Sequence, residues 1–179
     1  YVADLTVTKH GEVYQFSWDT GGNKYDGVGV QTDNFVSVAY TEGTNGKGCG
    51  VKLYKINSDG SLDGKLGYWG KDSIEIEKAI RTSGTDLVGE YQITGKNQND
   101  EQNKSKLTIS SSGPGFTFKW KGENSFNGGG VRLENMVTAG FGADQCGFVA
   151  YEIKPDGILV GKWGAVGVEQ FGTEKAIKK

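Results

Sequence analysis

The stretch that decides the fold is residues 49–65, CGVKLYKINSDGSLDGK, which returns as residues 146–162, CGFVAYEIKPDGILVGK. In both copies an apolar run leads into Asp-Gly, at 59–60 and at 156–157, and a second apolar run follows. Asp-Gly between two such runs indicates a β-hairpin, because glycine tolerates the positive φ that tight primed turns require. Each copy therefore predicts a pair of neighbouring antiparallel strands.

The similarity of the two copies extends over nearly the whole chain of 179 residues. The matching segments follow in one order: Leu5-Thr6-Val7 with Leu107-Thr108-Ile109, Phe16-Ser17-Trp18 with Phe118-Lys119-Trp120, Asn34 with Asn135, and a closing Glu-Lys-Ala-Ile at 77–80 and 174–177. Chance is a poor explanation for so many ordered matches. We interpret the chain as an internal duplication, with residues 1–82 as the first repeat and residues 83–179 as the second.

The pattern within each repeat is typical of strands. Residues 13–18 (VYQFSW) and 115–120 (GFTFKW) place aromatic side chains at every second position, which puts them on one face of a strand. Only residues 74–81 (IEIEKAIR) admit a helix, and their counterpart at 171–178 fits a closing strand as well. Many short strands separated by turns indicate a barrel or a sandwich. The predicted fold class is all-β, with two tandem antiparallel β-meander repeats.

The second repeat begins with a segment that the first repeat does not match. Residues 86–95 (DLVGEYQITG) alternate like a strand, and the corresponding piece of the first repeat would precede Tyr1. We therefore expect the first repeat to lack its leading strand within this sequence, or another chain to supply it.

Composition excludes several classes of function. Lys plus Arg is 20 and Asp plus Glu is 22, a net charge of −2, whereas nucleic-acid binders carry a dense basic face. No run approaches the roughly 18 apolar residues of a transmembrane segment. The start at Tyr1 and the 30 glycines among small polar residues favour an exported protein: periplasmic, cell-surface or secreted. Cys49 and Cys146 follow the repeat and form either one disulfide or two buried thiols.

Groups able to carry catalysis or bind a metal are few. The single histidine, His10, lies in an expected turn, so neither a metal cluster nor a Ser-His-Asp device is indicated. Glu77 and Glu174 are glutamates found at the same place in both repeats, and we expect each to satisfy a turn or to pair with a nearby Lys or Arg. We predict no enzyme activity, no cofactor and no metal site.

Aromatic residues provide the candidate contacts for a ligand or a partner. Those that recur at strand positions are expected in the core: Trp18, Trp120, Tyr25, Phe126, Tyr40, Phe141, Tyr54 and Tyr151. Tyr68, Trp69 and Trp163 lie in glycine-flanked segments nearer turns, where an exposed ring stacks on a sugar or contacts a partner protein.

The repeat pattern also resembles a known kind of protein. The motifs are Gly-x-Tyr-x-Ile-x-Gly at 89–95, Tyr-x-Ile-x-x-Asp-Gly-x-Leu-x-Gly-Lys-Trp at 151–163 and Gly-Thr-Glu at 172–174. They resemble the repeat unit of small exported bacterial β proteins, some of which are labelled fibronectin-binding proteins. The order of strands and turns is similar to avidin-type and lipocalin-type barrels, by analogy of fold alone. The first repeat has Leu66 in place of Trp163 and Glu75 in place of Gly172, which argues against two fully equivalent binding sites.

These observations favour a non-catalytic, exported binding or interaction module that presents a rigid β surface to a protein or a glycan. One alternative is a structural or accessory subunit of a larger cell-surface or membrane-associated assembly, since an open sheet edge accepts a strand from a neighbour. The other is a lipocalin-like carrier with a small ligand inside its barrel.

Overall fold

The computed structural model describes residues 1–44, 46, 48–96, 99–142 and 146–179, and its regular elements are all β-strands. In chain order they are β1 (Asp4–His10), β2 (Val13–Asp19), β3 (Lys24–Thr32), β4 (Phe35–Glu42), β5 (Cys49–Ile56), β6 (Leu62–Tyr68), β7 (Glu75–Thr85), β8 (Val88–Lys96), β9 (Gln102–Ser112), β10 (Gly115–Lys121), β11 (Ser125–Leu133), β12 (Met136–Gly142), β13 (Gly147–Ile153), β14 (Leu159–Gly164) and β15 (Gly172–Ala176). The predicted all-β fold class is confirmed. Residues 75–81 of the segment that also admitted a helix belong to β7.

The two Asp-Gly turns join the strand pairs that the sequence predicts. β5 pairs with β6, and β13 pairs with β14, both antiparallel. Gly60 and Gly157 have φ values of +82° and +80°, which residues with a β-carbon rarely adopt. These two glycines therefore allow the chain to reverse between the paired strands.

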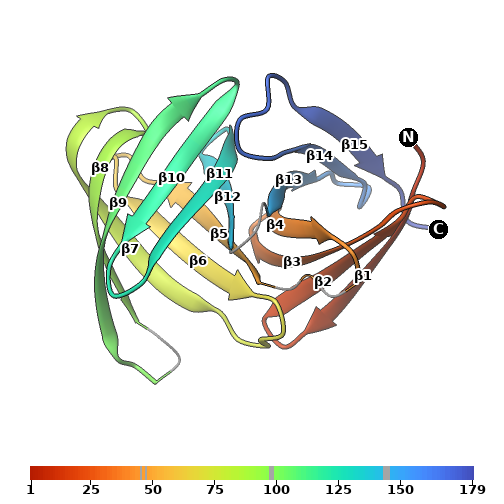
Figure 1. Cartoon of the computed structure of the whole chain (residues 1–179), viewed down its shortest axis with the longest axis horizontal. Coiled ribbons are helices and arrows are strands. Elements are labelled where there is room, and N and C mark those ends of the chain that lie inside the picture. Colours follow the sequence, from red (N-terminus) through yellow and green to blue (C-terminus); the bar gives the residue numbers. More distant parts are fainter. Residues whose placement is uncertain (45, 47, 97–98, 143–145) are drawn as a thin grey trace.

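The strands form two antiparallel sheets, shown in Figure 1. A closed barrel has eight strands in the order β10-β11-β12-β5-β6-β7-β8-β9, and a second sheet has seven in the order β1-β2-β3-β4-β13-β14-β15. We call the seven-stranded sheet the open half, because β1 and β15 each have only one hydrogen-bonded neighbour in the described part of the chain. The two chain ends lie close together beside these edges (Figure 1).

Each sheet takes strands from both sequence repeats. β4 of the first repeat pairs with β13 of the second in the open half, and β12 pairs with β5 in the barrel. The boundary between the repeats, at residues 82 and 83, lies inside β7. The sheets therefore divide the chain differently from the duplication, because the chain leaves one sheet after β4 and returns to it at β13. Within the described ranges β8 has no counterpart in the open half.

A shared apolar layer and a disulfide join the two halves. Side chains of β2, β3 and β4 pack against β5 and β12, and β13 packs against β11. Ser37 Oγ and Thr138 Oγ1 form a buried hydrogen bond of 2.5 Å across this layer. Cys49 and Cys146 form a disulfide, with their Cα atoms 5.8 Å apart. The sequence alone did not distinguish this bond from two buried thiols. The disulfide links the two places where the chain crosses between the sheets.

Side chains fill the interior of the barrel. The cluster consists of residues at most 3% exposed: Tyr54, Leu62, Ala79, Leu87, Tyr91, Ile93, Leu107, Ile109, Phe118, Trp120, Val137, Ala139 and Phe141. The interior of a closed eight-stranded barrel is just wide enough for side chains to fill it in this way.

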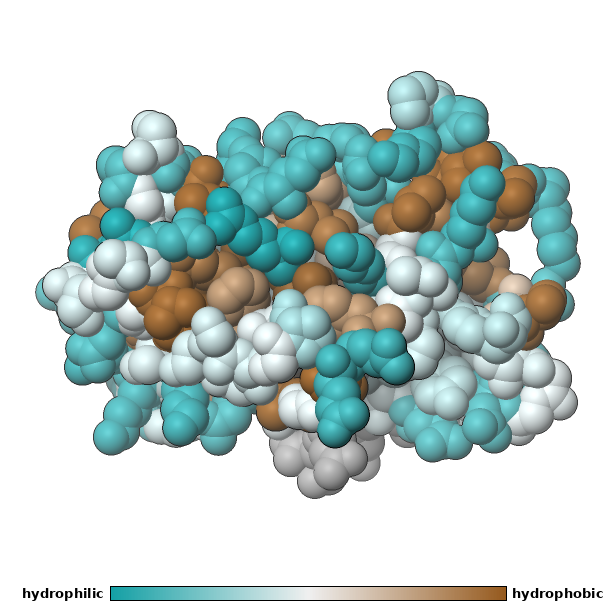
Figure 2. Space-filling view, turned by 90° about the horizontal axis from the view of Figure 1, so that it is seen from above, coloured by the Kyte–Doolittle hydropathy of each residue, from teal (hydrophilic) through white to brown (hydrophobic). Residues whose placement is uncertain are grey.

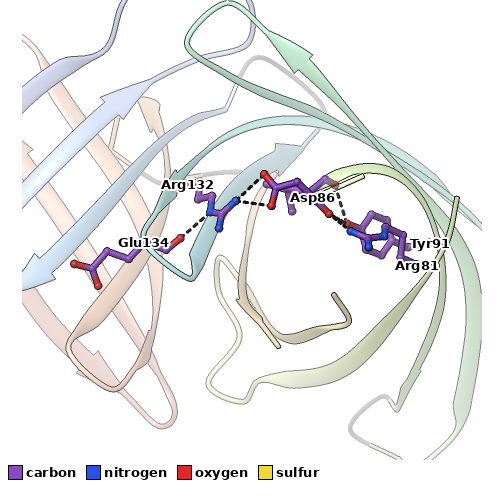
Figure 3. A network of polar contacts seen from close by, with 6 residues as sticks. Arg81, Asp86, Tyr91, Arg132 and Glu134 are labelled. Carbon is purple, nitrogen blue, oxygen red and sulfur yellow. Dashed lines mark hydrogen bonds and ion pairs between the residues drawn. The ribbon is translucent and has the colours of Figure 1, made fainter. Parts of the chain in front are cut away.

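The turn between β7 and β8 closes one end of the barrel, because it inserts Leu87, 1% exposed, into the interior. A polar network holds this turn (Figure 3). Arg132 Nη1 donates to both carboxylate oxygens of Asp86 at 3.0 Å, Arg132 Nε donates to the carbonyl oxygen of Glu134 at 2.7 Å, and Arg81 donates to the carbonyl oxygen of Asp86. The network ties β7–β8 to β11–β12, so the barrel is stabilised at this end.

Candidate functional site

The open half contains a pocket of about 310 Å³. Its lining is mainly aromatic and includes one carboxylate: Tyr1, Trp18, Thr20, Tyr25, Tyr40, Val149, Trp163 and Glu174. In Figure 2, seen from above with the open half on the right, hydrophobic side chains gather in that half around a hollow. The pocket therefore lies inside the curve of the seven-stranded sheet.

Glu174 is the acidic group of this pocket. It lies on β15 opposite Gly161 of β14, and the absence of a side chain at Gly161 leaves room for the Tyr151 ring, which would lie 2.6 Å from an added β-carbon. Its carboxylate accepts hydrogen bonds from the hydroxyls of Tyr1 and Tyr151, and the Trp18 indole Nε1 lies 3.4 Å from its Oε1. All three donors are neutral groups.

Burial perturbs the titrating groups of the pocket. Desolvation raises the pKa of the Glu174 carboxyl above its usual value, and hydrogen bonds from Tyr1 and Trp18 offset part of that rise. Burial, and then the neighbouring Tyr25 and Glu174, raise the pKa of Tyr40 to about 12. Tyr40 is therefore neutral near pH 7, and Glu174 is the acidic side chain among the residues that line the pocket.

Trp163 forms a wall of the pocket, and its place depends on a glycine. A β-carbon at Gly172, the strand partner of Trp163, would lie 2.1 Å from the indole. In the barrel the equivalent partners are Leu66 and Glu75. The change from Leu66 to Trp163 and the change from Glu75 to Gly172 are therefore coupled. The larger indole ring fits because the residue opposite it has no side chain. Tyr1 contacts this ring edge-on, with centroids 6.3 Å apart.

The indole Nε1 of Trp163 is buried and has no hydrogen-bond partner in the described part of the structure. A buried N–H without an acceptor costs free energy. The indole lies against Gly172, where an added β-carbon would lie 2.5 Å from this Nε1.

The barrel contains the counterpart of Glu174, and there the carboxylate has a cationic partner. Lys52 Nζ lies 3.0 Å from both oxygens of Glu77, and the Tyr54 hydroxyl also donates to Glu77. The Lys52 ammonium lies 4.7 Å from the ring centroid of Trp120 and 5.7 Å from that of Phe141. Desolvation lowers the pKa of Lys52, and the attraction of Glu77 offsets part of that fall. The expected pairing of this glutamate with a Lys is thus present at Glu77.

Strand register identifies which residue replaces Lys52 in the open half. Lys52 pairs with Ala139 on one side and Leu66 on the other. Val149 occupies the same place in β13, between Val38 and Trp163. The barrel thus has an ammonium where the open half has a valine and a pocket.

The residues singled out in the sequence as ligand or partner contacts lie in two places. Tyr68 and Trp69 line a groove of about 970 Å³ beside the disulfide, and the Tyr68 ring packs edge-on against Phe141 at 5.7 Å. Trp163 lines the other pocket. The structure does not bring the three together. His10 is exposed at the end of β1.

Three pocket residues were expected to belong to the core: Trp18, Tyr25 and Tyr40. The alternation of side chains along a strand correctly places these residues on the inward face of the sheet. It does not tell whether other side chains fill the space in front of that face. A signal was present in the difference between the repeats at positions 52 and 149, where a lysine aligns with a valine.

Comparisons of the chain with protein-family models, with curated proteins and with solved structures found no match. Within the described ranges, no helix has the length and apolar composition to span a membrane.

Proposed function

We propose that this protein is a non-catalytic binding protein that holds a small ligand in the pocket of its open half. The observation that carries the proposal is the contrast between two related sheets. The barrel interior is filled by side chains, whereas the equivalent place in the open half is a pocket of about 310 Å³. Ligand sites are typically concave and largely apolar, with a few convergent polar groups, and volumes from about 300 Å³ are usual.

The lining supports binding rather than surface contact alone. Trp163, Trp18 and Tyr40 line the pocket with aromatic rings, and the Glu174 carboxylate is a hydrogen-bond acceptor among them. Aromatic walls bury much of a ligand's apolar area, and one buried polar group fixes its orientation. The proposal therefore combines the binding-module hypothesis with the carrier alternative. The ligand is held in the pocket of the open half and not on a flat β surface.

Export is part of the same proposal. The Cys49–Cys146 disulfide is typical of proteins that fold in an oxidising compartment. A periplasmic, cell-surface or secreted binding protein is consistent with this bond.

Ligand-observed NMR with a fragment set of amines, sugars and neutral aromatic compounds tests the proposal. We expect fragments that bind the wild-type protein to lose at least tenfold in affinity in Trp163→Leu, which introduces the barrel's own residue at that position. The matched control is Trp69→Leu, which alters the other aromatic groove and should retain binding. If no fragment binds, or if Trp163→Leu binds all of them as well as the wild type, the pocket is not the site.

A second candidate function is strand acceptance within a larger assembly, which the free edges of β1 and β15 favour. In the barrel, β8 lies between β7 and β9, the counterparts of β15 and β1. An extended peptide with the β8 pattern would fit between the edges by backbone hydrogen bonds. A labelled peptide of residues 86–96 tests this. We expect saturable binding, which a peptide with Tyr91 and Ile93 replaced by Ser should not show.

A further inference from the structure

We propose that the pocket of the open half binds a compact organic cation, a primary or methylated ammonium group, in the place that the Lys52 ammonium occupies in the barrel. This inference rests on the proposed function, since it names the ligand class of the same site.

The chain itself provides the template for the ligand. In the barrel an ammonium lies 3.0 Å from both oxygens of Glu77 and 4.7 Å from the centre of the Trp120 ring. The corresponding anion in the open half is Glu174, and the corresponding ring is Trp18, at equivalent places in register. The open half therefore retains the groups that hold an ammonium.

The electrostatics of Glu174 also favour a cation. Its donors are two phenols and an indole, and no ion pair of the described residues includes it. A desolvated carboxylate is costly unless it is paired. A neutral ligand leaves that cost in place, and an anion adds repulsion. A cation offsets part of that cost by attraction, as Lys52 does for Glu77.

The rings around Glu174 suit the same ligand. Trp18 lies against Tyr40 with centroids 5.8 Å apart, and Tyr25 meets Tyr40 edge-on at 6.0 Å. These rings line the pocket together with Trp163. A cation over the face of an aromatic ring is attracted by the ring quadrupole, and aromatic cages recognise methylated ammonium groups in this way. Val149, at the place of Lys52, has no charge that would exclude the ligand.

The experiment measures binding of n-butylammonium and tetramethylammonium by NMR titration of the wild-type chain, with n-butanol and methyl glucoside as neutral probes. Two variants test the two halves of the argument. Glu174→Gln removes the charge and keeps an acceptor. Val149→Lys places a tethered ammonium beside Glu174, as in the barrel. We expect both cations to bind the wild type at least tenfold more tightly than the neutral probes, and each variant to weaken cation binding at least tenfold.

The possible outcomes separate this inference from the proposed function. If n-butanol or methyl glucoside binds as tightly as the cations and Glu174→Gln has no effect, the pocket binds a ligand and the cation inference is wrong. If no probe perturbs pocket resonances, the cation inference is wrong; if the fragment set also finds no ligand, the proposed function fails too. If Val149→Lys does not fold, the Glu174→Gln comparison decides alone.

Discussion

Replacement of Glu77 by Gln tests the buried charge pair on which the comparison of the two sheets depends. The Lys52 and Glu77 side chains are 8% and 7% exposed, and Nζ lies 3.0 Å from both carboxylate oxygens. Removal of one partner of such a pair leaves a buried charge and costs about 3–5 kcal/mol. The amide oxygen of the new glutamine would still accept a hydrogen bond from the Tyr54 hydroxyl, so we expect the lower end, about 3 kcal/mol.

Thermal unfolding measures this loss. For a chain of this length about 1 kcal/mol corresponds to 2–4 °C, so Glu77→Gln should lower Tm by about 6–12 °C near pH 7. The difference in Tm between the wild type and Glu77→Gln should become smaller as the pH rises. Because burial already lowers the pKa of Lys52 in the folded protein, the folded state releases its proton before the unfolded state does, and a neutral Lys52 needs no partner.

The matched control is Glu174→Gln, the same change at the equivalent position of the open half. It leaves no buried cation unpaired, so its effect on unfolding should stay within about 1 kcal/mol. The double variant Lys52→Met/Glu77→Gln should recover most of the stability, because it removes both charges. Equal losses in the two single variants, or no recovery in the double variant, would refute the reasoning.

Three further predictions follow from the described contacts. Replacement of Cys49 and Cys146 by Ser opens a link across 97 positions of sequence, which should cost about 4–5 kcal/mol in denaturant unfolding; unchanged stability would contradict this. Thr138→Val removes the buried hydrogen bond to Ser37 between the two halves and should cost about 1–3 kcal/mol, whereas Thr138→Ser should cost less; calorimetry that ranks them equally would assign no role to the hydroxyl. Ammonium affinity should rise with pH through the raised pKa of Glu174, because the ionised carboxylate is the binding form and the titratable side chains beside it are tyrosines; Glu174→Gln should abolish this dependence in titrations from about pH 4 upward.

Local chemistry made much of the fold predictable. The Asp-Gly turns at 59–60 and 156–157 indicated hairpins, and the positive φ of Gly60 and Gly157 has the expected sign. Period-two alternation indicated inward-facing aromatic residues, and Trp120 is indeed 3% exposed. Interactions between residues close in sequence control such features, so the sequence contains them directly.

The pairing of strands between repeats was not predictable in the same way. The two repeats have the same strand patterns, and β5 and β13 are matching strands. The sequence therefore does not tell which of these two strands pairs with β4 and which pairs with β12. The tertiary structure pairs β4 with β13 and β12 with β5. This pairing comes with the shared apolar layer and the disulfide, both of which join residues far apart in the chain.

The sequence by itself determined an all-β chain with a duplicated hairpin, two equivalent glutamates and two equivalent cysteines. Only the tertiary structure decided that one glutamate has a lysine beside it and the other a pocket. Lys52 and Glu77 are 25 positions apart, and they meet because β6 lies between β5 and β7 and holds all three strands in one register. The same register in the open half places Val149 and Trp163 near Glu174, so one fold forms a filled site and an open one.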